Sequence, residues 1–401
     1  MPKENLICIS LPSWNGDYAK STVQLVHGLS RHYRILYVDY AYTLKDVLFG
    51  LLGIRKIAIR PVLSFKHAIR KEFSKTGEEI FILSLPPLLP VNWISQQGLF
   101  LKMSRWNARL AENRIKRAMH QMDMHKPFLI NAFQPFLGVH LVGKFKEKCL
   151  LYYCYDEIAE ARWLGKHGAM MEKMLMQKAT LIVTSSRALE DRKKSFSQAI
   201  STITNGVDYA LFEKALSIPK KSQGRPVVGY TGSIDERFDT QLMRQVISQM
   251  PDCDFRFVGR VANANARDML QNFQNVSFEP PVKADEVPAI MRQMDVGIIP
   301  YLKNELTYCV YPLKINEFLA MGIPVVMTSF AQLEEFDQLV YRADQAGSFA
   351  DALRLALQEN DPQLKQQRIS KAGEQSWQHQ ADKLHQLVQK YAHQNESVLS
   401  Q

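Results

Sequence analysis

The feature that most constrains the fold is a regular alternation of short apolar runs with longer stretches of helical spacing along all 401 residues. Short apolar runs bounded by turn residues are typical of buried strands, and alternation with helices is typical of βαβ units. We expect strands near 6–10, 35–38, 80–83, 128–131, 149–153 and 181–184, and then near 227–230, 254–258, 276–278, 296–299 and 324–327.

The expected helices occupy the stretches between these runs. Examples are residues 18–31, 104–122 and 168–178 in the first half, and 240–250, 264–271, 287–294, 312–321 and 349–358 in the second. A chain of this length exceeds one ordinary core, so two domains are expected. The predicted fold class is α/β, with two Rossmann-like, doubly wound parallel-sheet domains.

Composition narrows the classes of protein that fit. The apolar fraction is 46% and the charged fraction 22%, as in soluble globular proteins. The five cysteines include no Cys-x-x-Cys pair, which argues against a disulfide framework or a zinc site and fits a reducing compartment. Residues 1–13 lack the apolar region of a signal peptide, and no stretch reaches the roughly 18 apolar residues of a membrane span. We therefore expect a cytoplasmic protein.

Charge is distributed unevenly between the two halves. Residues 1–200 carry 30 Lys and Arg against 16 Asp and Glu, whereas residues 201–401 carry 20 against 24. Basic and apolar residues mix in 51–73 and 99–122, a pattern that fits peripheral contact with an anionic membrane or a lipid-linked acceptor. The alternative is an ordinary solvated helix face. Nucleic acid is not expected as a partner, because zinc-finger spacing and RNA-binding aromatic signatures are absent from the sequence.

The segment 311–326, YPLKINEFLAMGIPVV, is the most informative motif. Pro312 and Leu313 are expected to open a helix, whose first free N–H groups and dipole form an anion site. Lys314 and Glu317 lie three positions apart on one face of this helix. The lysine can meet a phosphate while the glutamate accepts hydrogen bonds from sugar hydroxyls. This combination indicates a nucleotide-diphosphate site.

The same segment resembles the donor-binding signature of GT-B glycosyltransferases, in particular those of group 1/4 type in bacterial exopolysaccharide and teichuronic-acid biosynthesis. Further stretches match that group in the same order, and the resemblance covers most of the chain: 85–90, 181–186, 205–208 followed by Phe212, 228–232, 257–259 and 295–301. The resemblance implies an acceptor-binding domain (residues 1–205), a nucleotide-sugar-binding domain (206–374) and a C-terminal helix (375–401) that packs back on the first domain. The two domains would face each other across a cleft.

The activity implied by the resemblance is transfer of a sugar, hexosyl in type, from a UDP or GDP sugar to a polysaccharide or lipid-linked oligosaccharide. No metal or other cofactor is expected. The enzyme would work in the cytoplasm or at the inner face of the plasma membrane. Two alternatives remain open: a GT-B sugar-nucleotide epimerase, and a non-catalytic GT-B subunit that binds a nucleotide sugar.

Candidate donor-binding residues follow the strands of the second half, because ligands of open α/β sheets bind at the carboxyl ends of the strands. A small-residue loop after the first strand would let backbone N–H groups approach a diphosphate, and an arginine after the second could stack on a base or meet phosphate. By the resemblance, Lys314 binds the diphosphate and Glu317 the ribose. The remaining candidates are Gly232, Ser233, Arg260, Val282 and Tyr301.

One position departs from the family pattern. Many retaining GT-B enzymes carry two glutamates spaced E-x7-E, and if Glu317 is the second, the first falls on Cys309. A thiol cannot accept hydrogen bonds from a donor sugar as a carboxylate does, so the stereochemistry of transfer stays open. Glu305 is an alternative acid four residues earlier.

In the first half, Asp156 and Glu157 follow a predicted strand. An inverting transferase needs a carboxylate to accept the proton of the attacking hydroxyl, and we assign this role to Asp156, with Glu157 as the second candidate. An N-cap is the alternative role for Asp156. The loop 12–17 is a candidate acceptor pocket, in which Trp14 would offer an apolar face and Gly16 close approach; a simple tight turn is the alternative.

Overall fold

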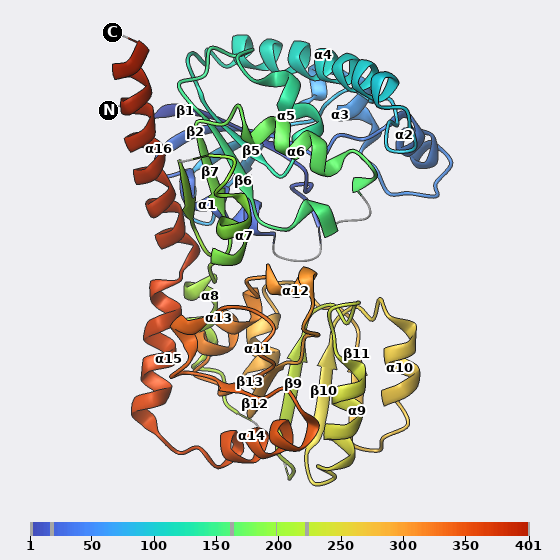
Figure 1. Cartoon of the computed structure of the whole chain (residues 1–401), viewed down its shortest axis with the longest axis vertical. Coiled ribbons are helices and arrows are strands. Elements are labelled where there is room, and N and C mark those ends of the chain that lie inside the picture. The colour runs from blue at the N-terminus through green and yellow to red at the C-terminus, as the bar shows by residue number, and fades with distance from the viewer. Residues whose placement is uncertain (1–2, 17–19, 161–163, 198, 221–223, 400–401) are drawn as a thin grey trace. The chain divides into compact units, whose positions relative to one another are not determined.

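The computed structural model describes residues 3–16, 20–160, 164–197, 199–220 and 224–399, with side chains described up to Ala392. The chain divides into two units (Figure 1). Unit 1 contains residues 3–16, the described residues of 20–203, and the chain from Gln380 onwards; unit 2 contains the described residues of 204–379. The predicted helix start at Tyr18 and the loop residue Asp17 lie outside the described residues.

Unit 1 is built on an eight-stranded sheet with the order β3-β4-β2-β1-β5-β6-β7-β8. Its strands are β1 (Glu4–Ser10), β2 (Tyr33–Val38), β3 (Ile69–Phe73), β4 (Glu79–Leu83), β5 (Phe128–Ala132), β6 (Leu150–Cys154), β7 (Leu181–Thr184) and β8 (Ile200–Thr202). All neighbouring strands run parallel except β3, which pairs antiparallel with β4. The expected purely parallel sheet is therefore wrong at this edge, where a short turn joins β3 to β4 and allows a hairpin.

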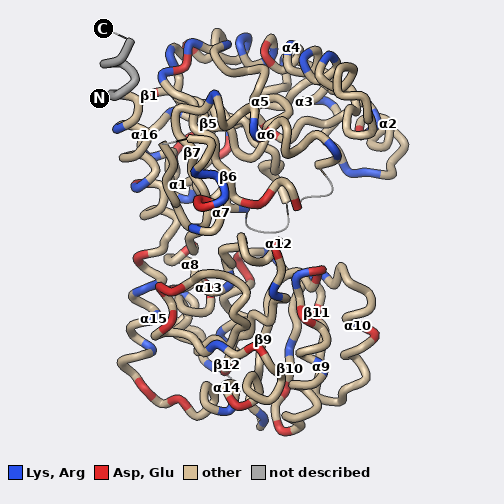
Figure 2. Tube along the Cα trace, viewed as in Figure 1, with Lys and Arg blue, Asp and Glu red and all other residues tan. Residues whose placement is uncertain are grey.

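The helices of unit 1 connect these strands. They are α1 (Ser21–Leu29), α2 (Leu44–Leu51), α3 (Ile59–Leu63), α4 (Gln97–Gln121), α5 (Pro135–Leu141), α6 (Gly168–Met176) and α7 (Arg187–Lys193). The longest, α4, begins seven residues before its predicted start at Ser104, because Phe100 is already buried on its inner face. Figure 2 shows many Lys and Arg positions, in blue, along α4.

Unit 2 is built on a six-stranded parallel sheet with the order β11-β10-β9-β12-β13-β14. Its strands are β9 (Val227–Thr231), β10 (Asp254–Val258), β11 (Val276–Glu279), β12 (Val296–Ile299), β13 (Val325–Met327) and β14 (Tyr341–Arg342). Its helices are α8 (Tyr209–Ala215), α9 (Thr240–Ser248), α10 (Ala264–Leu270), α11 (Val287–Met291), α12 (Glu305–Tyr308), α13 (Leu313–Ala320), α14 (Ala346–Gln358) and α15 (Pro362–Glu374).

This strand order is that of a doubly wound dinucleotide-type fold. The chain runs outward from β9 through β10 to β11 and then returns to β12 on the other side of β9. The central strands are apolar and fully buried, and they form one core with the inner faces of α9, α13 and α14. The reversal beside β9 creates a topological switch point at the carboxyl ends of β9 and β12.

The last helix, α16 (Trp377–Leu399), becomes part of unit 1 from Gln380 onwards. Within unit 1, His385 Nδ1 lies 2.9 Å from the Tyr33 hydroxyl, and Gln389 Nε2 donates to Glu4 over 2.6 Å. The imidazole of His385 stacks on that of His32 with centroids 4.1 Å apart. These contacts hold the C-terminal helix against the start of β1 and β2 (Figure 1).

Candidate functional site

The switch point of unit 2 brings together residues that lie far apart in the sequence. Gly232 follows β9, Tyr301 follows β12, and Lys314 comes from the first turn of α13. Lys314 Nζ lies 3.4 Å from the Tyr301 hydroxyl oxygen and 5.3 Å from the centroid of the Tyr230 ring. A cation therefore stands at the carboxyl edge of the sheet, where open α/β sheets bind ligands.

Gly232 leaves room for this lysine. Its φ is +122°, and a Cβ atom built on it would lie 2.5 Å from Lys314 Nζ. The Gly232 N–H donates to the Val258 carbonyl over 2.8 Å, so this donor is already occupied. The sheet edge therefore uses the Gly232 N–H, which leaves the approach to a diphosphate to other N–H groups of this loop, and Gly232 lets the lysine side chain reach the switch point.

Arg237, in the loop between β9 and α9, is a site residue that the sequence did not reveal. Its guanidinium donates from Nε to Asp235 Oδ1 over 2.9 Å and from Nη2 to Asp235 Oδ2 over 2.6 Å. It also lies 5.5 Å from the centroid of the Tyr301 ring. The Leu302 N–H donates to the Arg237 carbonyl over 2.7 Å, which fixes this loop against the loop after β12. These contacts with Tyr301 and Leu302, far away in the sequence, bring Arg237 to the residue that Lys314 also contacts.

The pKa shifts in this cluster report a positive local potential. Burial raises the pKa of Tyr301, but the charges of Lys314 and Arg237 and a hydrogen bond with Tyr230 outweigh it, so the pKa of Tyr301 is lowered. Burial also raises the pKa of Asp235, yet the hydrogen bonds and charge of Arg237 lower it overall. Two cations that favour a phenolate in a buried position would also favour an anionic ligand.

Helix α13 begins one residue later than expected. Pro312 is its N-cap, with φ −76° and ψ 124°, and Leu313 is the first helical residue. A proline in the extended conformation fits the N-cap, which adopts non-helical angles. The Ile315 N–H bonds to the Pro312 carbonyl over 3.3 Å. Among the described residues, no hydrogen-bond acceptor is found for the N–H groups of Leu313 and Lys314, so both can serve an anion.

Glu317 lies one turn after Lys314 and is half-buried. Burial raises the pKa of its carboxyl group, and the charge of Lys314 offsets this only in part. No hydrogen bond or ion pair to this carboxylate is found within the described part of the chain. A partly desolvated carboxylate without a protein donor is suited to accept hydrogen bonds from ligand hydroxyls.

The other predicted donor-site residues also follow strands of unit 2. Ser233 is half-buried, and its carbonyl accepts a hydrogen bond from the Tyr230 hydroxyl over 2.7 Å. Arg260 is exposed after β10, and its carbonyl accepts from the Ile234 N–H. Val282 follows β11 and packs half-buried against the core of unit 2. Cys309 is fully buried at the end of α12, whereas Glu305 is exposed in the first turn of that helix.

In unit 1, Asp156 and Glu157 follow β6 but have different surroundings. Asp156 is half-buried and accepts the Glu157 N–H over 2.9 Å. Glu157 is 3% exposed, and its Oε1 accepts from Lys193 Nζ over 2.8 Å. Lys193 Nζ also donates to Glu172 Oε2 over 2.8 Å. Glu157 is therefore committed to a buried ion-pair network, which disfavours it as a proton acceptor and leaves Asp156 as the candidate.

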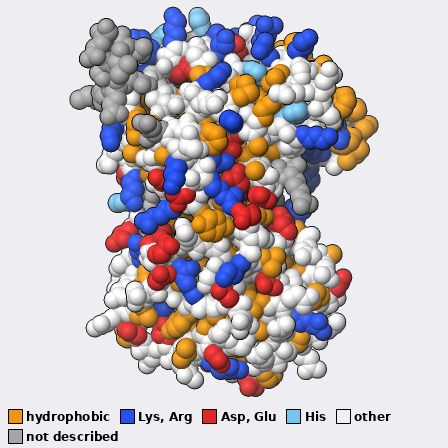
Figure 3. All heavy atoms as spheres, in the orientation of Figure 1, with side chains coloured by type: hydrophobic (Ala, Val, Ile, Leu, Met, Phe, Trp, Pro, Cys, Tyr) orange, Lys and Arg blue, Asp and Glu red, His pale blue; other side chains and the backbone are white. Residues whose placement is uncertain are grey.

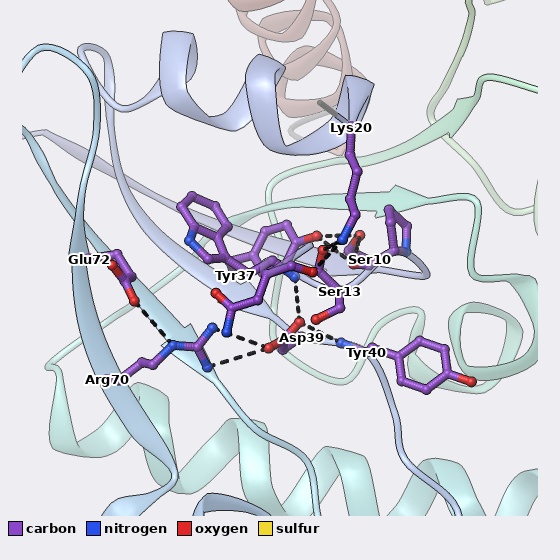
Figure 4. Close-up of polar contacts among 11 residues, drawn as sticks. Ser10, Ser13, Lys20, Tyr37, Asp39, Tyr40, Arg70 and Glu72 are labelled. Carbon is purple, nitrogen blue, oxygen red and sulfur yellow. Dashed lines mark hydrogen bonds and ion pairs between the residues drawn. The ribbon is translucent and has the colours of Figure 1, made fainter. Parts of the chain in front are cut away.

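The loop after β1 is held by Asp39 at the end of β2 (Figure 4). Asp39 Oδ1 accepts from the N–H groups of Trp14 and Tyr40 over 2.7 and 2.9 Å. Asp39 Oδ2 lies 3.4 Å from the Arg70 guanidinium. Asp39 is 6% exposed, so these bonds satisfy a buried carboxylate and fix the backbone of the loop.

Both predicted acceptor residues of this loop have contacts inside unit 1. The Trp14 ring packs on Tyr37 and His27, with centroids 5.0 Å apart in each pair. A Cβ atom on Gly16 would lie 2.5 Å from Lys20 Nζ, which donates to the Ser13 and Asn15 carbonyls (Figure 4). The absence of a side chain at Gly16 therefore leaves space for the Lys20 side chain. Part of the Trp14 ring surface is used for packing against Tyr37 and His27.

Neither a metal-binding cluster nor a membrane-spanning helix occurs among the described residues. No group of three or more His, Cys, Asp or Glu side chains in the described ranges is placed to hold a metal ion. No helix within the described part of the chain is long and apolar enough to cross a membrane.

Comparison with solved structures defines the class of fold. Sucrose-phosphate synthase from Thermosynechococcus elongatus superposes with a TM-score of 0.70 at 16% identity, covering 97% of this chain and 99% of that one. The Anabaena protein HepE, in complex with UDP and glucose, gives 0.61 at 13% identity and covers 99% of each chain. The predicted fold class, two doubly wound parallel-sheet domains of the GT-B type, is confirmed.

Sequence comparison adds the family. Residues 225–359 match the family model "Glycosyl transferases group 1", and this range contains the whole switch-point cluster. TuaH of Bacillus subtilis (strain 168), provisionally named a teichuronic acid biosynthesis glycosyltransferase, is 32% identical over 222 residues. That match covers 51% of this chain and 56% of the relative, so it spans about half the length of the relative. Together the comparisons support a GT-B glycosyltransferase of group 1, as the sequence motifs predict.

Proposed function

We propose that this protein transfers a sugar from a UDP or GDP sugar to a polysaccharide or lipid-linked oligosaccharide acceptor, without a metal. The observation that carries the proposal is the switch point of unit 2. There, Lys314 and Arg237 flank Tyr301 beside the free N–H groups of α13 and the half-buried Glu317. A nucleoside diphosphate sugar supplies the matching chemistry, with two phosphates for the cations and hydroxyls for the carboxylate.

The same groups give the proposed chemistry of the donor half of the reaction. Lys314, Arg237 and the N–H groups of Leu313 and Lys314 bind the diphosphate and stabilise the charge that develops on it as the sugar leaves. Glu317 accepts hydrogen bonds from the ribose. Arg260, exposed after β10, would reach a phosphate or stack on the base, and we assign Ser233 and Val282, which follow β9 and β11, to the same donor site.

For the acceptor half, we assign Asp156 of unit 1 as the group that accepts the proton of the attacking hydroxyl. Glu157, held by Lys193, positions the loop that carries Asp156. Trp14 and Gly16 belong to the proposed acceptor loop, whose backbone Asp39 fixes. The excess of Lys and Arg in the first 200 residues supports an acceptor anchored in an anionic membrane, and hence work at the inner face of that membrane.

The experiment is thermal stabilisation of the full chain by UDP, GDP, dTDP and CMP compounds, with and without EDTA. We expect stabilisation by one nucleoside diphosphate that EDTA does not reduce. A Lys314→Ala, Glu317→Ala variant should bind roughly a hundredfold more weakly, because it loses charge-assisted hydrogen bonds. Lys371→Ala, Glu374→Ala on α15, an ion pair of the same spacing, is the matched control. If none of the compounds stabilises the protein, the proposed donor site is refuted.

One observation favours a second candidate, a non-catalytic subunit that binds a nucleotide sugar. Cys309 occupies the position of the first glutamate of the family pattern and is fully buried. The Asp156→Asn variant separates the two. A transferase would lose turnover while its nucleotide affinity stays unchanged, whereas a binding subunit would show no turnover in either form.

A further inference from the structure

Apolar side chains are exposed in an unusual concentration on segment 44–63 of unit 1, which contains α2 and α3. Six of the thirteen large hydrophobic residues exposed among the described side chains lie in these twenty positions: Leu44, Leu48, Leu51, Leu52, Ile54 and Leu63, each at least half exposed. Figure 3 shows hydrophobic atoms gathered at the edge of unit 1 where Figure 1 labels α2, with Lys and Arg beside them.

Most of the apolar face of α2 is exposed. Leu44, Leu48 and Leu51 are spaced by four and three positions, which places them on one side of the helix. Val47 is the buried residue of this helix. A surface helix of a water-soluble protein ordinarily turns its apolar stripe toward the core. In α2, Val47 at one edge of this stripe is buried, whereas the three leucines beside it are exposed and mark a contact surface for an apolar partner.

The surface is held in place by its inner side. Thr43 and Asp46 form a capping box at the start of α2, and Arg55 pairs with Asp46. Val62 of α3 is buried, and its carbonyl accepts a hydrogen bond from Arg114 of α4 over 3.3 Å. The leucines thus project from an anchored backbone and do not depend on each other for the fold.

The charges around these leucines are mostly positive. The segment contains Lys45, Arg55, Lys56 and Arg60, and its one acid, Asp46, is already paired. Next to it, α4 carries six Lys and Arg residues against Glu112, which pairs with Lys116 (Figure 2). Leucines bordered by cations complement a bilayer with anionic headgroups, because the lipid acyl chains can surround the leucines and the headgroups can pair with the cations.

We propose that segment 44–63 is the surface on which this protein docks to an anionic lipid bilayer. The proposal rests on the proposed function in one respect: docking gives unit 1 access to an acceptor anchored in that bilayer. Leu48, Leu51 and Leu52 enter the acyl boundary, while Lys56 and Arg60 contact the headgroups.

The test is flotation of the full chain with phosphatidylcholine vesicles and with vesicles containing equal phosphatidylcholine and phosphatidylglycerol. We expect binding only to the anionic vesicles, weakened by added salt. The Leu48→Ser, Leu51→Ser, Leu52→Ser variant should bind about a hundredfold to a thousandfold more weakly, at roughly five- to tenfold for each leucine. Lys56→Glu with Arg60→Glu should weaken binding roughly tenfold or more.

The matched controls are Leu355→Ser and Lys214→Glu, which replace an equally exposed leucine and an exposed lysine of unit 2. Both should bind vesicles as the unmodified chain does. Equal binding by the triple-serine variant, or binding to neither vesicle, overturns the proposal. So does self-association in sedimentation velocity that the triple-serine variant abolishes, because the surface would then join two copies.

The nucleotide assay keeps this proposal separate from the proposed function. It is run without lipid, so retained nucleotide stabilisation with absent vesicle binding refutes the docking surface alone. Retained vesicle binding with absent nucleotide stabilisation refutes the donor site alone.

Discussion

Replacing Lys193 by Met should destabilise unit 1 strongly, because Lys193 neutralises two buried carboxylates. Its Nζ lies 2.8 Å from both Glu157 Oε1 and Glu172 Oε2, and the three side chains are 7%, 4% and 3% exposed. Burial lowers the pKa of Lys193, but the charge of Glu172 and the hydrogen bonds of both glutamates raise it overall. Methionine fills a similar volume without the charge. Both carboxylates would then be left buried without this cation.

The magnitude follows from that environment. Removing one partner of a buried ion pair costs about 3–5 kcal/mol when the remaining charge is left uncompensated. Arg192 Nη1 stays 3.8 Å from Glu157 Oε2, so the loss falls mainly on Glu172. The three side chains are shielded from water, so screening reduces this little. In a unit of roughly 200 residues, each kcal/mol lowers Tm by about 2–4 °C. The expected loss for Lys193→Met is therefore about 6–20 °C in Tm.

The neighbouring lysine provides the control. Lys194 also pairs with a carboxylate, that of Asp191 at 2.9 Å, but both side chains are more than 60% exposed. Exposed pairs often contribute nothing measurable, so Lys194→Met should leave Tm unchanged. Thermal unfolding followed by calorimetry measures both variants. In the Lys193→Met background, Glu157→Gln with Glu172→Gln should restore part of the loss. Equal Tm values for the two methionine variants would refute the assignment of charge burial to Lys193.

Four further predictions concern the donor site and the pH dependence of stability. Gly232→Ala should abolish nucleotide stabilisation, because its Cβ occupies the place of a lysine side chain and φ is +122°; Gly224→Ala, which meets no atom within 4 Å, should not. Arg237→Gln should raise the Kd for the nucleoside diphosphate about ten- to hundredfold in a titration, and an unchanged Kd would place the phosphates elsewhere. Burial raises the pKa of Glu317, so its ionised form destabilises the fold: Glu317→Gln should raise Tm at neutral pH, with the gain fading as the pH falls from the raised pKa to the usual glutamate pKa and absent below it. Burial, with the charges of Arg105 and Lys178, lowers the pKa of His140 to about 4. Between about pH 6.5 and pH 4, the unfolded chain therefore binds a proton at His140 that the folded chain does not. As the pH is lowered through this window, the free energy of unfolding should decrease less steeply in His140→Phe than in the unmodified chain.

The local pattern of apolar residues was enough to predict most of the fold, and the local spacing of Lys314 and Glu317 was enough to predict one part of the candidate site. The central strands β9 and β12 are mostly apolar runs that can be buried only in a covered sheet, so their positions are visible in the sequence. Lys314 and Glu317 could be predicted together because they share one turn of one helix. The edge strand β3 could not, since its sequence IRKEF has no continuous apolar run and pairs on one side only.

Tertiary structure decided which charges meet. Arg237 and Lys314 are 77 positions apart, and nothing in the local sequence of either indicates that both flank Tyr301. The same holds for Glu157, whose burial against Lys193 separates its role from that of Asp156 next to it. It holds too for α2, whose apolar spacing is that of a core helix until the fold turns the leucines outward. The periodic spacing of apolar residues in a helix or strand can be seen from neighbouring residues in the sequence. The desolvation and pairing of charges depend on distances that only the folded chain sets.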